Sequence, residues 1–273
     1  MTDFGIADDA VGLCKGQMLS ICTDATIIDI CHTTTPWDVR SGARLLRDLP
    51  HFYPAWTVVA AVVYPETGTE IGTIAVRVPT GQIYVAPNNG LLTAVLEDHG
   101  YTEAYEATSL DITPEHPEPT WYGRDLVAIQ AAHLAAGFPL DKVGPPIADE
   151  KIVRFEAPQP AKSNEGKLTG ILTGIDRPFG NVWTNLSSEL LRELGYAYGS
   201  DLRITLDDAL IFDLTLTETF GDRPLGAPVA YLNSRGYFSL GRNQGDLAER
   251  YHLTAGMTVT VEANPVSMNG KQP

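Results

Sequence analysis

The hydrophobic pattern of the first half of the chain predicts strands that alternate with helices. Residues 57–64 are apolar and β-branched on both faces, which is typical of a strand that is covered on both sides of a sheet. Two further strands are predicted at 73–78 and 82–87, and a short turn joins them. Helical spacing of apolar residues occurs at 41–52 and at 125–137. This alternation predicts an α/β domain with a mostly parallel sheet.

A change of composition divides the chain into two domains. Residues 154–166 hold Pro, Gly and polar side chains, which is typical of an exposed linker, so the α/β domain is expected to span 1–153. The remaining part, 167–273, contains short β-branched runs and one helical segment at 187–194. This pattern predicts a smaller, all-β, barrel-like C-terminal domain.

The first residues of the chain do not match the usual beginning of an α/β domain. Such a domain normally opens with a buried strand, whereas residues 1–5 (MTDFG) resemble the loop that follows one. Two possibilities stay open: the leading strand lies outside this sequence, or another segment takes its position.

The charge and the cysteine content limit the kinds of binding partner and the cellular compartment that are expected for this chain. The 273 residues include 34 Asp and Glu but 19 Lys and Arg, which gives a formal net charge of −15. Such an acidic chain is not expected to bind nucleic acid. The longest apolar run, at 57–64, is too short to span a bilayer, so no membrane association is expected. The odd number of cysteines, Cys14, Cys22 and Cys31, predicts reduced thiols in the cytoplasm.

The common catalytic and metal-binding signatures are absent from the sequence. It contains no nucleophile elbow, no phosphate-binding Walker loop and no His-Glu-x-x-His zinc helix. His133 lies in an apolar helical segment, where a structural histidine is more common than a metal ligand, and His32 precedes a threonine run that is typical of a turn. We therefore expect neither a metal nor a cofactor.

Short strings rich in Gly, Asn and aromatic residues remain as the candidate binding elements. In chain order they are YPETGT (64–69), APNNG (86–90), TWYGRD (120–125), DRPFGNVWTN (176–185) and LNSRG (232–236). Each string by itself is explained as a turn or a loop. Together they place aromatic side chains beside Asn, Asp and Arg, which suits a flat heteroaromatic ligand with a polar, zwitterionic tail.

In this order, the five strings resemble the S-adenosylmethionine (SAM)-dependent fluorinase, chlorinase and hydrolase family over nearly the whole chain. The resemblance implies an anion that attacks the ribose C5′ of SAM and releases methionine. Because the sulfonium is already a good leaving group, the protein needs only to desolvate the anion and hold it behind C5′. The resemblance also implies a homotrimer, with each site between the N-terminal domain of one subunit and the C-terminal domain of the next.

The resemblance further implies roles for individual residues. Asp3 is expected to accept hydrogen bonds from the ribose hydroxyls. The catalytic region around C5′ and the anion is expected to comprise Tyr64, Thr67, Trp121 and Gly123, with Trp37 and Tyr122 beside it. The residues expected at the methionine end of the substrate are Asp8, Asp176, Trp183, Ser234 and Arg235. Those expected around the adenine are Phe179, Asn181, Phe220, Arg242 and Asn243.

The choice of nucleophile depends on where the chain departs from the family. Hydrolase-type members carry an Asp, an Arg and a His that handle water, and the corresponding positions here are Tyr64, a site near Ile71, and Tyr122. Without a general base, water is a poor nucleophile at neutral pH, whereas a halide needs no deprotonation. The sequence therefore favours a halide over water.

Two further departures favour chloride over fluoride. Fluorinases resemble this chain but have a long insertion where it has the tight turn 79–81, and they have a Ser at the position of Gly123. A glycine leaves a wider cavity with a backbone N–H donor, which suits the larger and more easily desolvated chloride. We therefore expect a chlorinase that forms 5′-chloro-5′-deoxyadenosine and L-methionine. The alternatives are a SAM hydrolase that forms adenosine, a fluorinase, and a non-catalytic sensor of adenosyl ligands.

Overall fold

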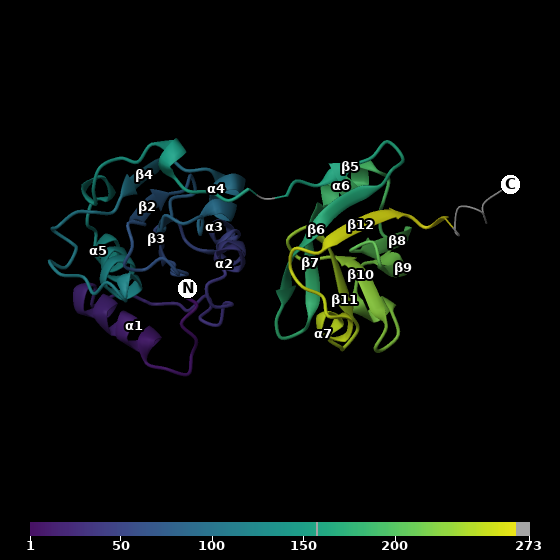
Figure 1. The fold of residues 1–273 in the computed structure, drawn as a ribbon, viewed down its shortest axis with the longest axis horizontal. Helices are drawn as coiled ribbons and strands as arrows, with labels where there is room; N and C mark the ends of the chain where they lie inside the picture. Colours follow the sequence, from purple (N-terminus) through teal and green to yellow (C-terminus); the bar gives the residue numbers. More distant parts are fainter. Residues whose placement is uncertain (157, 266–273) are drawn as a thin grey trace. The chain divides into compact units, whose positions relative to one another are not determined.

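The computed structural model describes residues 1–156 and 158–265, and the chain divides into the units Met1–Glu156 and Ala157–Pro273 (Figure 1). The N-terminal unit contains a four-stranded sheet with the order β1-β3-β2-β4. Its strands are β1 (Val58–Ala60), β2 (Thr73–Arg77), β3 (Ile83–Pro87) and β4 (Glu103–Glu106).

The expectation of a mostly parallel sheet is not confirmed, because this sheet is mixed. β1 runs parallel to β3, but β2 runs antiparallel to both β3 and β4. The reason is the tight turn at 79–81, in which Gly81 N–H donates to Val78 O at 2.9 Å. A turn this short can join only antiparallel neighbours, since a parallel pair needs a crossover of about a dozen residues.

Helices cover this sheet, and the loops that join them to the strands carry the candidate residues. In chain order they are α1 (Ala10–Ile21), α2 (Val39–Leu46), α3 (Leu49–Phe52), α4 (Thr93–His99), the π-helix η1 (Gly123–Ala128), α5 (Ile129–Ala135), and the short 3₁₀ turns η2 (Leu140–Lys142) and η3 (Asp149–Lys151). The helical segment predicted at 41–52 is split between α2 and α3, and the one at 125–137 is formed by η1 and α5. The periodicity of the sequence did not predict α1, whose apolar Leu13 and Leu19 are exposed rather than buried.

Apolar side chains fill both faces of the sheet. One face packs Val59, Val63 and Tyr84 against α2 and α4, and the other packs Val62 and Val85 against η1 and α5. A sheet that is covered on both sides explains why residues 57–64 are apolar without alternation. The segment that follows β1 therefore places the buried side chain of Tyr64 at a well-defined position on the second of these faces.

The first residues of the chain lie between two segments of this unit. Val62 N–H donates to Met1 O at 2.9 Å and Thr2 N–H donates to Cys31 O at 3.0 Å, while Thr2 and Val62 form an isolated parallel bridge. Asp3 N–H then donates to Val62 O at 3.2 Å. Residues 1–3 are therefore placed by the extension of β1, and Asp3 is placed with them.

The C-terminal unit is a β-barrel, as predicted. Its strands are β5 (Ala161–Lys162), β6 (Leu168–Asp176), β7 (Asn181–Ser187), β8 (Asp201–Leu206), β9 (Leu210–Thr217), β10 (Pro228–Leu232), β11 (Tyr237–Arg242) and β12 (Thr258–Ala263). Strands β6 to β12 close into the barrel because β12 pairs with both β8 and β6. The buried side chains that fill it include Leu172, Val182, Ile204, Phe238 and Leu240. Strand β5 lies inside the expected linker 154–166 and pairs with β6.

Three short helices accompany the barrel, namely α6 (Ser188–Glu193), η4 (Phe220–Asp222) and α7 (Leu247–Tyr251). Helix α6 lies within the helical segment predicted at 187–194, and Ser187 caps it by accepting a hydrogen bond from Leu190 N–H at 3.3 Å. Within the described ranges, no helix combines the length and the apolar character needed to cross a bilayer.

Candidate functional site

A cavity of about 290 Å³ in the N-terminal unit brings together most of the site residues predicted there. It is lined by Asp3, Phe4, Pro36, Trp37, Val62, Tyr64, Thr67, Thr120, Trp121 and Gly123. All four residues expected in the catalytic region line it, together with Asp3 and Trp37. These residues come from segments that are far apart in the sequence, so the cavity is a product of the fold.

Asp3 and Trp37 connect two loops at this cavity. The Asp3 carboxylate Oδ2 accepts a hydrogen bond from Trp37 N–H at 2.9 Å. The backbone of Trp37 has a φ of 64°, which a residue with a large side chain rarely adopts. Such a conformation persists only where neighbouring contacts hold it, and it is often found at binding sites. Trp37 is 76% exposed and also lines the cavity, so it is available to a ligand there.

Tyr64 is a buried wall of the cavity with a fixed hydroxyl. Its hydroxyl donates a hydrogen bond to the carbonyl oxygen of Ile71. Burial raises the pKa of Tyr64 to about 12, so the phenol stays protonated at neutral pH. Tyr64 therefore cannot act as a general base on a molecule in the cavity under ordinary conditions.

Thr67 presents a hydroxyl to the same cavity. Its Oγ1 accepts a hydrogen bond from Tyr122 N–H at 3.1 Å and donates to Pro119 O at 3.3 Å. The neighbouring Gly68 has a φ of 80°, and a Cβ there would lie 2.6 Å from Pro119 O. A glycine is therefore required at this turn, which accounts for the string YPETGT.

Gly123 is the first residue of the π-helix η1 and is buried in the cavity wall. A Cβ at this position would lie 2.8 Å from Val62 Cγ1 and 2.9 Å from Phe4 Cζ. Any larger residue must therefore displace one of these side chains. The amide groups of a first helical turn have no intrahelical partner, so Gly123 can offer its N–H to an anion.

The string TWYGRD places two aromatic residues ahead of this helix. Trp121 lies edge-on to Phe4, with ring centroids 6.4 Å apart, and the guanidinium of Arg124 lies 4.5 Å from the Trp121 ring centroid. Arg124 in turn donates to Asp125 at 2.8 Å, and this hydrogen bond keeps the pKa of Asp125 below its usual value. The ring centroids of Tyr122 and Tyr64 lie 6.3 Å apart. Tyr122 is not among the residues that line the cavity.

Besides Tyr122, Asp8 is the predicted site residue of this unit that does not line the cavity. It is exposed in the bend before α1, and its Oδ1 accepts a hydrogen bond from Asp9 N–H at 2.8 Å.

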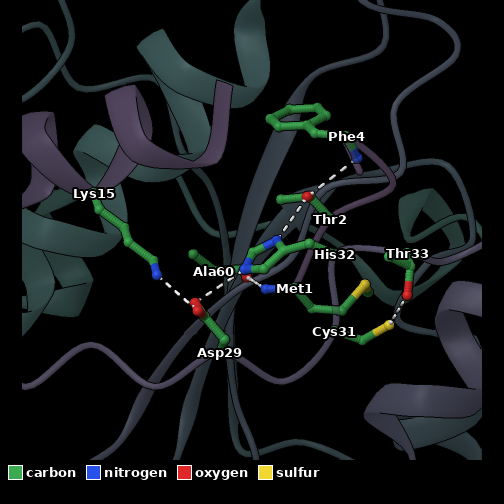
Figure 2. Close-up of polar contacts among 9 residues, drawn as sticks. All are labelled: Met1, Thr2, Phe4, Lys15, Asp29, Cys31, His32, Thr33 and Ala60. Atoms are coloured by element: carbon green, nitrogen blue, oxygen red, sulfur yellow. Dashed lines mark hydrogen bonds and ion pairs between the residues drawn. The ribbon is translucent and has the colours of Figure 1, made fainter. Parts of the chain in front are cut away.

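A chain of polar contacts that the sequence did not reveal holds the segment next to Asp3 (Figure 2). His32 Nδ1 lies 2.8 Å from Thr2 Oγ1, and His32 Nε2 lies 3.0 Å from Asp29 Oδ1. Asp29 also accepts from Lys15 Nζ at 2.7 Å, and this hydrogen bond together with that from His32 lowers the pKa of the Asp29 carboxyl. His32 was expected in a turn and lies in a bend of the chain. Its contact with Thr2 fixes the neighbour of Asp3 in the chain.

In the C-terminal unit, the string DRPFGNVWTN (176–185) spans the end of β6, the turn at 177–180 and the first residues of β7. Asn181 Nδ2 donates to Asp176 Oδ2 at 3.1 Å across the base of this turn. Phe179 is 65% exposed at its tip. This arrangement places the Asp176 carboxylate, the Asn181 amide and the Phe179 ring at one end of the barrel. These groups suit a polar ligand that also contains a planar ring.

The turn LNSRG carries two more predicted residues at the end of β10. Asn233 is buried, and its Oδ1 accepts from Arg235 N–H at 2.9 Å and from Tyr237 N–H at 3.1 Å. This turn exposes Ser234 and Arg235, and the Arg235 guanidinium lies 4.6 Å from the ring centroid of Trp183 on β7. Asn233 was part of the string but was not predicted as a site residue; its role is to shape the turn.

The residues expected around the adenine have structural partners as well. Arg242 Nε donates to Gly226 O at 2.7 Å, and Asn243 Nδ2 donates to Arg223 O at 2.7 Å. Phe220 packs on Tyr231, with ring centroids 4.7 Å apart, and burial raises the pKa of Tyr231 to about 12. These contacts fix the loop that follows β9. Across the described residues, no group of three or more His, Cys, Asp or Glu could hold a metal ion.

Comparison with known proteins gives matches over both units. The model of the SAM hydroxide adenosyltransferase N-terminal domain matches residues 1–144, and that of the corresponding C-terminal domain matches residues 170–260. The chain is 50% identical to a fluorinase of Actinopolyspora mzabensis, over 96% of this chain and 95% of that protein. It is 34% identical to an (R)-S-adenosyl-L-methionine hydrolase of Salinispora arenicola, over 96% of each. A solved structure of an uncharacterized conserved protein from Thermotoga maritima superposes with a TM-score of 0.90 at 30% identity, covering 95% of this chain and 97% of that one.

Proposed function

Because the chain belongs to the SAM hydroxide adenosyltransferase family, we propose that it transfers the adenosyl group of SAM to chloride and forms 5′-chloro-5′-deoxyadenosine and L-methionine. The observation that carries the choice of a halide over water is the chemistry of the cavity wall. The titratable side chains that line it are Asp3 and Tyr64. The Tyr64 phenol is neutral, with a pKa of about 12, and its proton is directed at Ile71 O. Asp3 is bonded to the backbone of Trp37.

The reaction that suits such a cavity moves no proton. The lone pair of chloride forms a bond to C5′, the C5′–S bond breaks, and its electron pair returns to sulfur as the neutral thioether of methionine. A negative ion and a positive sulfonium thereby neutralise each other. A dry cavity strengthens the attraction between these charges and removes the water that shields the ion.

We assign the anion contact to the Thr67 hydroxyl and the Gly123 N–H. The Thr67 hydroxyl reaches an anion by rotating its proton away from Pro119 O, which it contacts at a long 3.3 Å. Tyr64 and Trp121 wall the anion position, because both line the cavity and neither carries a charge there. Orientation of the anion by such fixed groups lowers the barrier to the displacement in this proposal.

The remaining assignments follow the sequence-based expectations. Asp3 binds the ribose hydroxyls, and Arg235 binds the methionine carboxylate through charge-assisted hydrogen bonds. The stacking of Arg235 on Trp183 supports this role, since it orients the guanidinium. We further propose a homotrimer in which the two halves of each site come from neighbouring subunits. The free state of the described cysteines supports a cytoplasmic location.

Fluoride is the second candidate nucleophile, because relatives at about half identity are named fluorinases. Fluoride is small and tightly hydrated, so its transfer requires several donors to replace water. The cavity offers the Thr67 hydroxyl and, at position 123, a backbone N–H without a side-chain hydroxyl. This donor set favours the more easily desolvated chloride.

Product analysis tests the proposal directly. The purified protein is incubated with SAM and with chloride, bromide, fluoride or no halide, and the nucleoside products are separated by chromatography. We expect 5′-chloro-5′-deoxyadenosine and an equal amount of methionine, with formation that depends on chloride. Adenosine formed at the same rate without halide would instead identify a hydrolase, and a product with fluoride but not chloride would identify a fluorinase. Tight binding of SAM without any product would identify a sensor.

A further inference from the structure

His32 contacts both ends of the segment 2–5, which contains two residues of the candidate site. At one end, its ring nitrogen Nδ1 lies 2.8 Å from Thr2 Oγ1. At the other end, its carbonyl oxygen accepts a hydrogen bond from Gly5 N–H at 2.7 Å. Asp3 and Phe4 lie between these two contacts in the chain, and both line the candidate cavity, whereas His32 does not. We call the contacts of His32 with Thr2 and Gly5 the histidine clamp.

The imidazole of His32 lies between a carboxylate and a hydroxyl (Figure 2). Its Nε2 lies 3.0 Å from Asp29 Oδ1, and Asp29 Oδ2 accepts a hydrogen bond from Lys15 Nζ at 2.7 Å. These two contacts lower the pKa of the Asp29 carboxyl, which is therefore ionised at neutral pH. In a neutral imidazole, one ring nitrogen donates and the other accepts. Because an ionised carboxylate can only accept, the ring proton belongs on Nε2, and Nδ1 then accepts the proton of the Thr2 hydroxyl.

The Thr2 hydroxyl connects this imidazole to the backbone of the segment 2–5. Its Oγ1 accepts a hydrogen bond from Phe4 N–H at 3.2 Å while it donates to His32. Thr2 is buried, with 7% of its surface exposed. Removal of the imidazole would therefore leave a buried hydroxyl without its acceptor, which is costly enough to let the segment rearrange. The clamp thus fixes the residues on both sides of Asp3.

The two clamped residues contact the groups on which the proposed reaction depends. Asp3 is the proposed ribose ligand, and its carboxylate accepts a hydrogen bond from Trp37 N–H at 2.9 Å. Phe4 lies edge-on to Trp121, with ring centroids 6.4 Å apart. Its Cζ lies 2.9 Å from the position that a Cβ on Gly123 would take. The clamp therefore affects both the ribose contact and the wall of the proposed anion position.

We propose that His32 is a positioning residue for SAM binding: through the clamp it holds Asp3 and Phe4 in the positions that receive the substrate. The identity of the substrate rests on the proposed function. His32 acts at a distance, because its imidazole and its carbonyl oxygen are both bonded within the protein. Groups that are already held in their bound positions bind a ligand without the entropy cost of ordering them. Loss of the clamp should therefore weaken the binding of SAM.

Hydrogen exchange tests the clamp without any use of catalysis. The Phe4 amide donates to Thr2, and the Trp37 amide donates to Asp3, so the exchange of these two amides reports whether the segment is held. We expect His32→Leu to accelerate both by about fivefold or more. His99→Leu is the matched control, because His99 is also half-buried and its Nε2 lies 2.9 Å from a backbone carbonyl oxygen, but it does not line the cavity. Equal exchange in the two variants would overturn the proposal.

Calorimetry of SAM binding tests the consequence for the ligand. We expect Thr2→Val and His32→Leu each to raise the Kd for SAM about tenfold, and the double variant to raise it no further, because both substitutions break the same hydrogen bond. Thr2→Ser keeps the hydroxyl and His32→Asn keeps an acceptor oxygen near the position of Nδ1, so both should retain most of the affinity. Losses that add up in the double variant, or that neither conservative variant reduces, would contradict an action through Thr2.

The tautomer of His32 provides a spectroscopic test of the same hydrogen bond. At about pH 8, NMR of the ring nitrogens should place the proton on Nε2. A proton on Nδ1 would reverse the hydrogen bond to Thr2 and contradict the proposal. The binding data also separate this inference from the proposed function. A parent chain that bound no SAM would overturn both, whereas SAM binding in the parent with equal affinity in His32→Leu would overturn the inference alone.

Discussion

The Asp3 carboxylate accepts the backbone N–H of Trp37 at 2.9 Å and thereby holds a residue whose φ is 64°. This contact joins the loop after Thr2 to the loop before α2. Because Asp3 N–H also donates to Val62 O at 3.2 Å, the position of both loops depends on the extension of β1. The Asp3 carboxylate therefore holds together two loops that line the cavity.

The variant Asp3→Ala should weaken SAM binding strongly. It removes a charged acceptor from the proposed ribose contact and also releases Trp37 from its uncommon conformation, and a hydrogen bond to a charged group contributes about 1.5 to 3 kcal/mol. We expect the KM for SAM to rise at least about tenfold. Steady-state kinetics would measure this, with Asp9→Ala, at the exposed N-cap of α1, as the control. An unchanged KM would show that Asp3 does not bind the substrate.

The variant Tyr64→Phe should lose stability but keep its activity. The hydroxyl donates to Ile71 O, so its removal leaves a carbonyl without its donor and should lower the free energy of unfolding by about 1 to 2 kcal/mol. We expect turnover within about a factor of two of the parent, because Tyr64 moves no proton. Urea unfolding and chloride kinetics measure the two effects.

The pH dependence of chloride transfer provides a second test of the role of Tyr64. Since its pKa is about 12, the phenol is protonated throughout the neutral range, and chloride transfer should show no rising limb between about pH 6 and pH 9. A rate that increases with pH, in the parent but not in Tyr64→Phe, would show that the tyrosine activates water and would contradict halide transfer.

The variant Gly123→Ser should depress chloride turnover. Its Cβ would meet Val62 at 2.8 Å and Phe4 at 2.9 Å, and overpacking of this kind costs about 1 to 3 kcal/mol. We expect kcat/KM for chloride to fall about tenfold or more. Gly72→Ser is the matched control, because a Cβ there has no atom within 4 Å. The second substitution Val62→Ala in Gly123→Ser should restore part of the activity; unchanged kinetics in Gly123→Ser alone would remove Gly123 as a determinant of the anion.

The Met1 amino group should make stability depend on pH between its two pKa values. In the unfolded chain it binds a proton below about pH 8, but in the folded chain only below about pH 6. The unfolded state binds more protons in this window, so stability rises from pH 6 to pH 8, by roughly 2 to 3 kcal/mol for a shift of this size. Below pH 6 this stabilisation is absent.

Acetylation of Met1 isolates this contribution, because it removes the amine and leaves every other titratable group in place. Chemical unfolding of the free and acetylated chains at several pH values should give curves that diverge as the pH falls from 8 to 6, with the acetylated chain the more stable at the acid end. Parallel curves would show that the amine is solvated rather than buried.

Local patterns in the sequence were sufficient for the elements that depend on their own residues. The apolar runs at 73–78 and 82–87 predicted β2 and β3, and the β-branched runs after 167 predicted a barrel. The resemblance of the strings YPETGT and TWYGRD to the family implied the positions of Thr67 and Gly123. The structure gives a reason for the glycines in these strings, since a Cβ at Gly68 or Gly123 would lie less than 3.0 Å from a neighbouring atom.

The tertiary structure decided the features that depend on distant partners. Strand direction is one: the alternation of strands and helices predicts a mostly parallel sheet, whereas the tight turn at 79–81 makes β2 and β3 antiparallel. Helix α1 is another, since its one buried residue, Cys14, leaves no apolar stripe to detect. The contact of His32 with Thr2 and that of Asp3 with Trp37 join residues about thirty positions apart. Periodicity indicates which side of a segment is buried, whereas the pairing of distant segments depends on the whole chain. The resemblance of the sequence to the family therefore named the residues of the cavity, but only the tertiary structure gave their geometry.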